Sequence, residues 1–283
     1  MIKEGQQEDG RYCRYFTLGA TEVDLHNRLR LSALMGFFQE TAGDQCELFG
    51  SGWSTLWEKH GMCYVVIRVE IRMDRYPGTG ETVRIDTWPD NKLRMIFDRY
   101  GEVYGVDGLR IGSIVSQWAL LDVNTRHFVR PNPEIVTMPD TSTLKPPFLL
   151  TKDNIFADQD AGIREFAALR APGFSDFDYN GHMNNARYAE WAVDALWQAL
   201  TEDERATKPR IDRLDIKFRA EIPASMTGTP LKLTVKLQPK QKLFSLKGTD
   251  AAEDVDPACK ADPDNAAPPK RATLRFECEG NYS

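Results

Sequence analysis

The sequence predicts an α+β fold in which a long helix wrapped by an antiparallel sheet occurs twice in tandem. Two observations support this prediction. The first half contains one helix with an apolar face followed by several strand-like runs, and the second half repeats that order. Such a helix needs a sheet to cover it, and about five antiparallel strands can curl around one helix. We expect the first unit at residues 1–135, a linker at residues 136–162 and the second unit at residues 163–283.

The first half opens with an alternating segment at residues 12–18 and continues with an apolar stripe at helical spacing. The stripe consists of Leu31, Leu34, Met35, Phe38, Ala42, Cys46 and Phe49. Steps of three and four residues place these side chains on one face of a helix of about 18 residues. Four runs rich in β-branched and aromatic residues follow, at residues 62–73, 81–88, 93–106 and 110–123. Turn signals separate the runs, so an antiparallel meander is expected.

The second half repeats this order, with a strand at residues 164–170, a helix at 186–200 and strands near 213–221, 230–237, 242–247 and 271–279. Local matches support the correspondence. They are Asp24 with Asp178, Leu34 with Tyr188, Phe37 with Trp191, Arg72 with Arg219, and Asp74 with Glu221. Chance could supply any one of these matches, but their shared order indicates a duplication.

Two irregular segments interrupt the pattern. Residues 130–162 carry five of the sixteen prolines and little apolar periodicity, which is typical of an extended linker on the surface. Residues 250–270 are rich in Ala, Asp and Pro and interrupt the last two strands, so we expect a disordered loop there rather than a site.

Composition excludes several classes of protein. The 283 residues are 41% hydrophobic, enough for substantial cores, and the formal net charge is −6. No block of Lys and Arg stands out, so a general nucleic-acid role has no electrostatic support. No stretch approaches the roughly 18 apolar residues that span a bilayer, and the first residues lack a signal-peptide pattern. A cytoplasmic protein without a membrane span is expected.

The cysteines and histidines show no ligand spacing. The five cysteines are Cys13, Cys46, Cys63, Cys259 and Cys278, and no two of them form a C-x-x-C pair. This pattern argues against a disulfide framework and a structural zinc site. The four histidines also lack a recognised metal-ligand spacing. We therefore expect reduced thiols, no metal and no cofactor.

The most informative segment is residues 178–185, which read Asp-Tyr-Asn-Gly-His-Met-Asn-Asn directly before the second predicted helix. The free N–H groups of a helix N-terminus favour negative charge, so this segment is suited to holding an oxyanion. Asn and Asp are also good helix caps, which explains one or two of these residues. In an extended segment, Asp178, Asn180 and His182 would project to one side and converge.

The first copy provides an internal comparison. Its equivalent segment has Asp24, His26 and Arg28 at the corresponding positions, so only the second copy carries the Asp, Asn and His arrangement. A fourth polar group is Glu221, at the end of the predicted strand 213–221. From the residues alone, an ordinary carboxylate paired with Arg219 or solvent is the simpler interpretation of Glu221.

Three motifs carry a resemblance to a known family. They are Asp-x-Asn-x-His-x-Asn-Asn-x-x-Tyr-x-x-Trp at residues 178–191, Phe-Arg-x-Glu at 218–221 and Leu-x-x-x-x-Gln-Glu at 34–40. Together they resemble the fatty acyl-acyl carrier protein (ACP) thioesterases of plant plastids and bacteria, over nearly the whole chain. The resemblance implies a double hotdog fold and hydrolysis of the fatty acyl-ACP thioester. It also implies a catalytic set of Asp178, Asn180, His182 and Glu221.

One departure from the family bears on mechanism. Plant members often have Cys directly after the glutamate, whereas this chain has Ile222, so a cysteine nucleophile is disfavoured. We expect Glu221 and His182 to orient and deprotonate water, with Asn180 and backbone N–H groups stabilising the oxyanion and Asp178 orienting Asn180 or His182. Attack by Asp178 itself, giving an anhydride, is the competing assignment.

Substrate and partner residues are less clearly marked. Candidates for an apolar acyl slot in the first copy are Leu34, Met35, Phe38, Trp53 and Trp57, although such a stripe is more often core. The resemblance implies ACP as partner, with its phosphopantetheine arm carried by the substrate. Because ACP is acidic, docking needs local positive charge, for which the candidates are Arg210, Arg213, Lys217 and Arg219. A solvated strand face is the alternative for these four, and a homodimer is left open.

Three other functions fit the same sequence. An acyl-CoA thioesterase would perform the same chemistry on a carrier that bears a nucleotide. A non-catalytic acyl-binding protein would not need the four polar residues that the second copy retains. A hydratase on the same fold is the third alternative.

Overall fold

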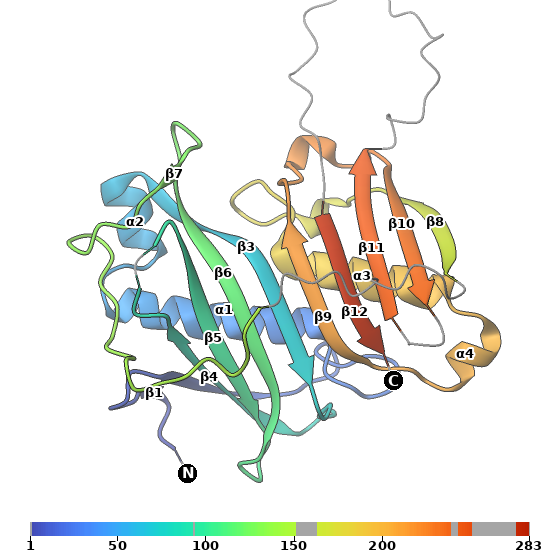
Figure 1. Ribbon diagram of the computed structural model, residues 1–283, viewed down its shortest axis with the longest axis horizontal. Coiled ribbons are helices and arrows are strands. Elements are labelled where there is room, and N and C mark those ends of the chain that lie inside the picture. The colour runs from blue at the N-terminus through green and yellow to red at the C-terminus, as the bar shows by residue number, and fades with distance from the viewer. Residues whose placement is uncertain (1, 93, 151–162, 239–242, 251–275, 283) are drawn as a thin grey trace, which may run out of the picture.

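The computed structural model describes residues 2–92, 94–150, 163–238, 243–250 and 276–282 (Figure 1). The described part of the first copy contains two helices, α1 (Leu31–Leu48) and α2 (Trp53–His60), and seven strands. The strands are β1 (Gly5–Gln6), β2 (Tyr12–Thr17), β3 (Met62–Met73), β4 (Thr82–Pro89), β5 (Ile96–Tyr104), β6 (Arg110–Asp122) and β7 (Phe128–Val129).

The second copy repeats the helix and strands. It contains β8 (Arg164–Arg170), α3 (Asn185–Ala199), α4 (Glu202–Ala206), β9 (Ile211–Phe218), β10 (Leu231–Gln238), β11 (Leu243–Asp250) and β12 (Phe276–Tyr282). The predicted strand at residues 164–170 is confirmed with the same bounds. The strand predicted at 213–221 ends at Phe218 instead, so Glu221 lies beyond the strand and not at its end.

Within the described ranges, the strands form one antiparallel sheet in the order β1-β2-β4-β5-β6-β3-β9-β12-β11-β10-β8, with β7 paired to β6. The sheet curves around α1 in the first copy and α3 in the second, and both helices lie on the same side of it (Figure 1). The predicted α+β class and the double hotdog arrangement, one helix wrapped by each half of the sheet, are confirmed.

The order of the strands in the first copy differs from the prediction. β4, β5 and β6 are consecutive neighbours, but β3 lies on the far side of β6 and does not touch β4. The predicted meander of four consecutive strands is therefore wrong for β3. This position leaves the second edge of β3 free to pair with β9, and that pairing joins the two copies into one sheet.

The apolar face of α1 packs into the sheet as its spacing predicts. Leu34, Met35 and Phe38 are each at most 2% exposed and belong to the main core. The ring of Phe38 lies directly against Gly101 of β5, where an added Cβ would come within 2.7 Å of it. Only glycine therefore allows this close approach of helix and sheet.

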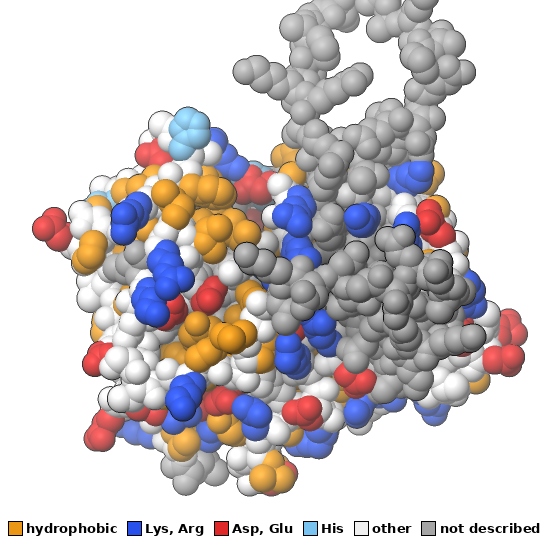
Figure 2. Space-filling model, viewed as in Figure 1, with side chains coloured by type: hydrophobic (Ala, Val, Ile, Leu, Met, Phe, Trp, Pro, Cys, Tyr) orange, Lys and Arg blue, Asp and Glu red, His pale blue; other side chains and the backbone are white. Residues whose placement is uncertain are grey.

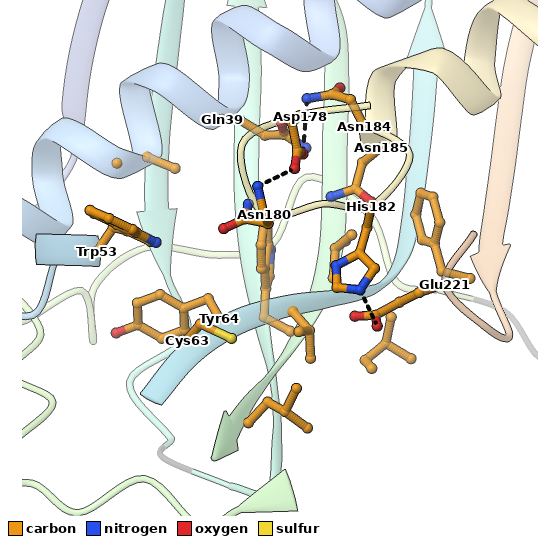
Figure 3. Close-up of a pocket in the computed structure, with 18 of the residues that line it drawn as sticks. Gln39, Trp53, Cys63, Tyr64, Asp178, Asn180, His182, Asn184, Asn185 and Glu221 are labelled. Atoms are coloured by element: carbon orange, nitrogen blue, oxygen red, sulfur yellow. Dashed lines mark hydrogen bonds and ion pairs between the residues drawn. The ribbon is translucent and has the colours of Figure 1, made fainter. Parts of the chain in front are cut away.

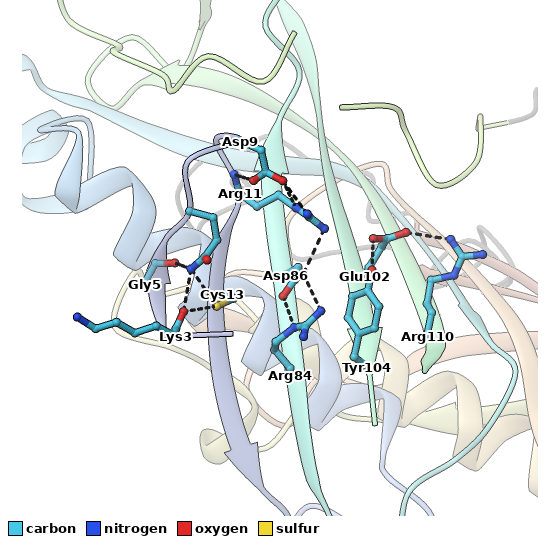
Figure 4. A network of polar contacts seen from close by, with 11 residues as sticks. Lys3, Gly5, Asp9, Arg11, Cys13, Arg84, Asp86, Glu102, Tyr104 and Arg110 are labelled. Atoms are coloured by element: carbon cyan, nitrogen blue, oxygen red, sulfur yellow. Dashed lines mark hydrogen bonds and ion pairs between the residues drawn. The ribbon is translucent and has the colours of Figure 1, made fainter. Parts of the chain in front are cut away.

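The opposite face of the first copy's sheet carries a polar network (Figure 4). Asp86 of β4 is 2% exposed and accepts a hydrogen bond of 2.8 Å from Arg84, while Arg11 lies 3.5 Å away. Burial raises the pKa of the Asp86 carboxyl, and the two guanidinium groups oppose that shift. Nearby, Glu102 accepts hydrogen bonds from Tyr104 and Arg110. Charged pairs thus cover the face that the helices do not.

A buried ion-pair network holds the junction between the copies. Glu70 of β3 is fully buried and Asp215 of β9 is 2% exposed. Arg68 donates to Asp215 over 2.8 Å, and Arg213 and Arg72 each donate to Glu70 over 2.8 Å. Buried carboxylates need such partners, because an unpaired charge away from water is costly. Arg213, a predicted partner-binding residue, therefore has a structural contact across the two copies.

Most of the described residues at 131–150, in the segment between the copies, are exposed or half-buried as predicted, but some pack against the first copy. Val136 is buried against Leu56 of α2 and Leu120 of β6, and Phe148 packs on the guanidinium of Arg72 at 3.8 Å. Residues 151–162 of the predicted linker, and nearly all of the predicted loop at 250–270, lie outside the described residues.

In the described part of the chain, no helix is long and apolar enough to cross a membrane.

Candidate active site

Residues 178–182 form a tight turn before α3. The N–H of Asp178 donates to the carbonyl of His182 over 3.0 Å, and the N–H of Gly181 donates to the carbonyl of Asp178 over 3.0 Å. The Oδ1 atom of Asp178 accepts from the N–H of Asn180 over 2.9 Å. Gly181 has a φ of +77°, a left-handed conformation that glycine adopts without strain. The predicted extended conformation of this segment is therefore wrong.

The first copy contains the same turn. Asp24 donates its N–H to the carbonyl of Arg28 over 2.8 Å, and its Oδ1 accepts from the N–H of His26 over 2.8 Å. Asn27 takes the place of Gly181, with a φ of +57°. Asn tolerates this region better than most residues. The shared turn supports the duplication and indicates that the aspartate in both copies builds the turn.

The two turns differ in the side chains at their third and fifth positions. In the second copy they are Asn180 and His182, whereas in the first they are His26 and Arg28. His26 packs beside Trp197 with ring centroids 5.6 Å apart, and Arg28 donates to the carbonyl of Pro209 over 3.1 Å. The first turn thus makes structural contacts with the second copy, while the second turn faces a pocket.

The second turn is fixed to α3 and to the segment after β9. Asn184 caps α3 by accepting from the N–H of Ala186 over 2.9 Å, and its amide lies 3.4 Å from Oδ2 of Asp178. The N–H of Met183 donates to the carbonyl of Ile222 over 2.8 Å. This backbone hydrogen bond places Glu221 beside His182, although the two are far apart in sequence.

The imidazole of His182 and the carboxylate of Glu221 are in close polar contact (Figure 3). Nε2 of His182 lies 3.2 Å from Oε2 of Glu221, and the same oxygen accepts a hydrogen bond from Arg126. In Figure 3, Nδ1 lies on the side of the ring nearer Asn180. The side chain of Glu221 is 39% exposed, so this pair orients groups more than it stabilises the fold.

Arg126 is a site residue that the sequence did not predict. It lies in the turn between β6 and β7 of the first copy, with a φ of +59°. Asp122 builds this turn by accepting hydrogen bonds from the N–H groups of Asn124 and Thr125 and from the Thr125 hydroxyl. The site therefore combines a guanidinium from one copy with the carboxylate and imidazole of the other.

These groups lie on the wall of a pocket of about 760 Å³ between the copies. Asp178, Asn180, His182 and Glu221 all line it, so the structure brings the four predicted catalytic residues to one cavity. The cavity is also lined by Asn184 and Asn185, Trp53, Trp57, Tyr64, Phe97, Trp118 and Phe128, among others. The catalytic candidates at one side, with many aromatic and aliphatic side chains around the rest, suit a ligand with one polar end.

The predicted acyl-slot residues divide into two groups. Trp53 and Trp57 line the pocket, with stacked rings 5.8 Å apart, and Trp53 also meets the ring of Tyr179 edge-on. Leu34, Met35 and Phe38 lie in the core and are not among the residues that line the pocket. The two tryptophans therefore remain candidates for contact with a ligand.

The predicted partner-binding residues do not form one patch at the pocket. Arg219 lines the pocket, and Lys217 is opposite Arg68 in the β3–β9 ladder. Arg213 is eight residues before Glu221, about 25 Å along an extended chain, and Arg210 is farther away beside Asp212. Figure 2 shows Lys and Arg side chains over the junction between the copies, on the face away from the helices.

Two cysteines line the pocket and remain protonated thiols. Burial raises the pKa of Cys46 and Cys63, with Arg99 opposing the shift at Cys46 and Arg126 at Cys63. A thiol is a poor nucleophile compared with its thiolate. Among the described residues, no group of three or more His, Cys, Asp or Glu side chains is placed to hold a metal ion.

The shared turn leads to a prediction about the two aspartates. Asp24→Ala and Asp178→Ala should each lower the free energy of unfolding by about 1–2 kcal/mol, because each removes a side-chain cap of backbone N–H groups. Thermal or denaturant unfolding measures this change. If the aspartate also serves the site, only Asp178→Ala should impair turnover. Equal loss of turnover in both variants would show that the effect arises from stability alone.

Comparison with known proteins identifies the family of this chain. The model of the acyl-ACP thioesterase N-terminal domain matches residues 10–138, and that of the acyl-ACP thioesterase C-terminal domain matches residues 164–256. The chain belongs to the acyl-ACP thioesterase family. The family's two domains therefore correspond to the two copies of the duplication.

Individual members of the acyl-ACP thioesterase family are distant in sequence. A chloroplastic acyl-[acyl-carrier-protein] hydrolase of Cuphea viscosissima is 26% identical over 233 residues, which cover 75% of this chain and 52% of that protein. A chloroplastic dodecanoyl-[acyl-carrier-protein] hydrolase of Umbellularia californica is 25% identical over 232 residues, covering 74% and 55%. The chain spans about half the length of these curated relatives.

Solved structures of the family share the fold along the whole chain. An acyl-ACP thioesterase from Bacteroides thetaiotaomicron superposes with a TM-score of 0.72 at 21% identity, covering 98% of this chain and 99% of that one. The 12:0-ACP thioesterase of Umbellularia californica gives a TM-score of 0.66 at 19% identity, covering 99% of both chains. At this identity the likeness shows the fold alone.

Proposed function

We propose that this chain hydrolyses the thioester of fatty acyl-ACP and releases the free fatty acid. The observation that carries the proposal is the contact of 3.2 Å between His182 and Glu221, which lie with Asn180 on the wall of a pocket whose other walls carry many aromatic and aliphatic side chains. The wall supplies a base and a hydrogen-bond donor, and the rest of the pocket can surround an acyl chain. Membership of the acyl-ACP thioesterase family supports the same reaction.

In the proposed mechanism, His182 is the general base. Glu221 lies 3.2 Å from Nε2 and favours the tautomer with its proton there, so that Nδ1 takes a proton from a water molecule that attacks the thioester carbonyl. Arg126 holds the carboxylate in place through the oxygen that also contacts His182. Glu221 therefore orients the base and balances the charge that develops on the imidazole. This division of work refines the joint role that the sequence predicts for Glu221 and His182.

The oxyanion requires a donor close to the base. The side-chain amides of Asn180 and Asn185 both line the pocket beside His182 and are suited to this role (Figure 3). The thiolate leaving group corresponds to a thiol with a pKa of about 8.5, so it departs without strong acid catalysis. Collapse of the tetrahedral intermediate breaks the C–S bond, and the imidazolium returns its proton to the thiolate.

A water nucleophile is favoured over Asp178. One oxygen of the Asp178 carboxylate accepts from the Asn180 N–H and the other lies 3.4 Å from the Asn184 amide. The first copy keeps the same aspartate in the same turn without the other catalytic groups. Asp178 is therefore proposed as a positioning residue for Asn180.

The carrier is tested by measuring thiol release from acyl-ACP and acyl-CoA with the same acyl chain. We expect a higher kcat/KM for acyl-ACP, and a decline as salt is raised if Arg219 and Lys217 attract the acidic carrier. Charge reversal at Lys232, which lies on the β10 strand away from the pocket, provides a control for general charge effects. A higher kcat/KM for acyl-CoA would instead indicate an acyl-CoA thioesterase.

A further inference from the structure

One edge of β3 is unpaired where it borders the active site. β3 pairs with β6 from Met62 to Met73, but on its other edge it pairs with β9 only from Arg68 to Arg72. In the described part of the chain, no strand pairs with this edge at residues 63–67. Figure 1 shows β3 and β9 diverging toward the end of the sheet near α2. Such an edge presents main-chain N–H and C=O groups without strand partners.

The divergence breaks the internal symmetry of the duplication. Arg72 of the first copy corresponds to Arg219 of the second, a separation of 147 residues. By the same separation, Arg213 corresponds to Val66. If the two copies were fully symmetric, the observed pair Arg72–Arg213 would therefore be matched by a pair Val66–Arg219. The first pair exists, but the second does not. Continuing the register would also place Tyr64 opposite Glu221. The β3–β9 ladder therefore continues to Arg72 at the end near the turn of the first copy. At the end near the turn of residues 178–182, it stops at Arg68.

The open region is part of the pocket. Five consecutive residues of β3, from Cys63 to Ile67, line the cavity, as do three consecutive residues from Arg219 to Glu221. Successive side chains of a strand point to opposite faces, so a cavity on one face would contact alternate residues only. Contact with consecutive residues on both sides indicates a slot in the plane of the sheet. A bulge at Ile67 marks where the slot begins.

We propose that this slot binds the pantetheine part of the carrier as an added strand. Pantetheine is an extended chain with two secondary amides, each of which offers an N–H donor and a C=O acceptor, as a peptide does. These amides would form hydrogen bonds with the free edge of β3, in the manner of strand addition. The thioester at the end of the arm would then lie beside Glu221 and His182. This inference rests on the proposed thioesterase function and adds the mode of carrier binding.

Neutral main-chain contacts also suit the charge of the protein. The chain has a formal net charge of −6, so overall electrostatics do not attract an acidic carrier. Hydrogen bonds between amides and a strand edge need no positive patch. Each such bond should change affinity by about threefold to tenfold, the usual range for a neutral hydrogen bond.

A series of thioesters with the same acyl chain tests the contribution of the amides. The carriers are pantetheine with two amides, N-acetylcysteamine with one, and a simple alkyl thiol with none. We expect kcat/KM to fall about threefold to tenfold for each amide removed, mainly through a higher KM. Equal kcat/KM across the series would overturn the proposal. Thiol release from none of these thioesters or from acyl-ACP would instead contradict the thioesterase function.

Amide hydrogen exchange tests the location directly. A thioether analogue of acyl-pantetheine, with CH₂ in place of the thioester carbonyl, should slow exchange at residues 63–67 when it saturates the protein. An alkyl thioether without amides fills the acyl pocket only and should leave these residues less protected. Strand β4, which is paired on both edges, serves as the internal control. Equal protection by the two ligands, or none at residues 63–67, would overturn the proposal.

Discussion

Asn180→Ala should lower kcat for thioester hydrolysis about a hundredfold to a thousandfold, with a much smaller change in KM. Loss of one oxyanion donor costs this much in comparable acyl-transfer enzymes, because the donor acts mainly in the transition state. Asn180 is suited to this role because its backbone is fixed by the Asp178 carboxylate while its side chain lines the pocket. Steady-state kinetics on one acyl-ACP substrate measure both constants.

The first copy provides a matched control for this variant. His26 occupies the same position in the equivalent turn, but it packs beside Trp197 and does not line the pocket. His26→Ala should therefore leave kcat close to the wild-type value at a temperature where the protein is folded. If Asn180→Ala were as active as His26→Ala, Asn180 would not be the oxyanion donor.

His182→Gln should lower kcat about a hundredfold to ten-thousandfold, the usual contribution of a general base. The glutamine side chain is similar in size and can still donate a hydrogen bond to Glu221, but it cannot accept the proton from water. Folding should therefore be retained while catalysis is lost. Circular dichroism and thermal unfolding check the fold, and thiol release measures the activity.

The partners of His182 should show graded effects. Arg126→Gln removes the guanidinium but leaves the Glu221–His182 contact possible, so its effect should be smaller than that of His182→Gln. Arg110→Gln is a matched control, because Arg110 has a similar exposure of 47% against 50% for Arg126 and pairs with Glu102 instead. Full activity of His182→Gln would contradict its role as the base.

Much of the fold could be predicted from local pattern. The three-and-four spacing of the α1 stripe gave the helix and its buried face, and the turn residues gave most of the strands. The position of β3 could not be predicted in this way, because strand order depends on pairing between residues that are distant in sequence. Its run of β-branched and aromatic residues does not specify which edge of β6 it joins.

The helix α2 was also missed, for a different reason. Its eight residues include Trp53, Ser54, Thr55 and Trp57, which have no strong helix propensity. Leu56 is fully buried against Leu120 and Val136, so tertiary packing supports the helix. Such a contribution depends on the assembled fold and leaves little trace in the local sequence.

The site was predictable where its groups are close together in the chain. The density of polar residues at 178–185 indicated a functional site before the second helix, although the turn itself was not predicted, and the resemblance to a family added Glu221. Arg126 left no signal, since an exposed arginine in a hairpin is common and its contact with Glu221 spans 95 residues. The spacing of apolar residues along the chain also could not show that Phe38 lies in the core while Trp57 lines the pocket.

We propose that the second turn, and not the first, makes this protein a thioester hydrolase. The most direct test is thiol release from a long-chain acyl-ACP by the wild-type protein, the His182→Gln variant and the Arg28→Gln variant of the equivalent first-copy position. We predict turnover by the wild-type protein and Arg28→Gln, and loss of turnover in His182→Gln. No thiol release by the wild-type protein, or equal release by all three, would contradict the claim.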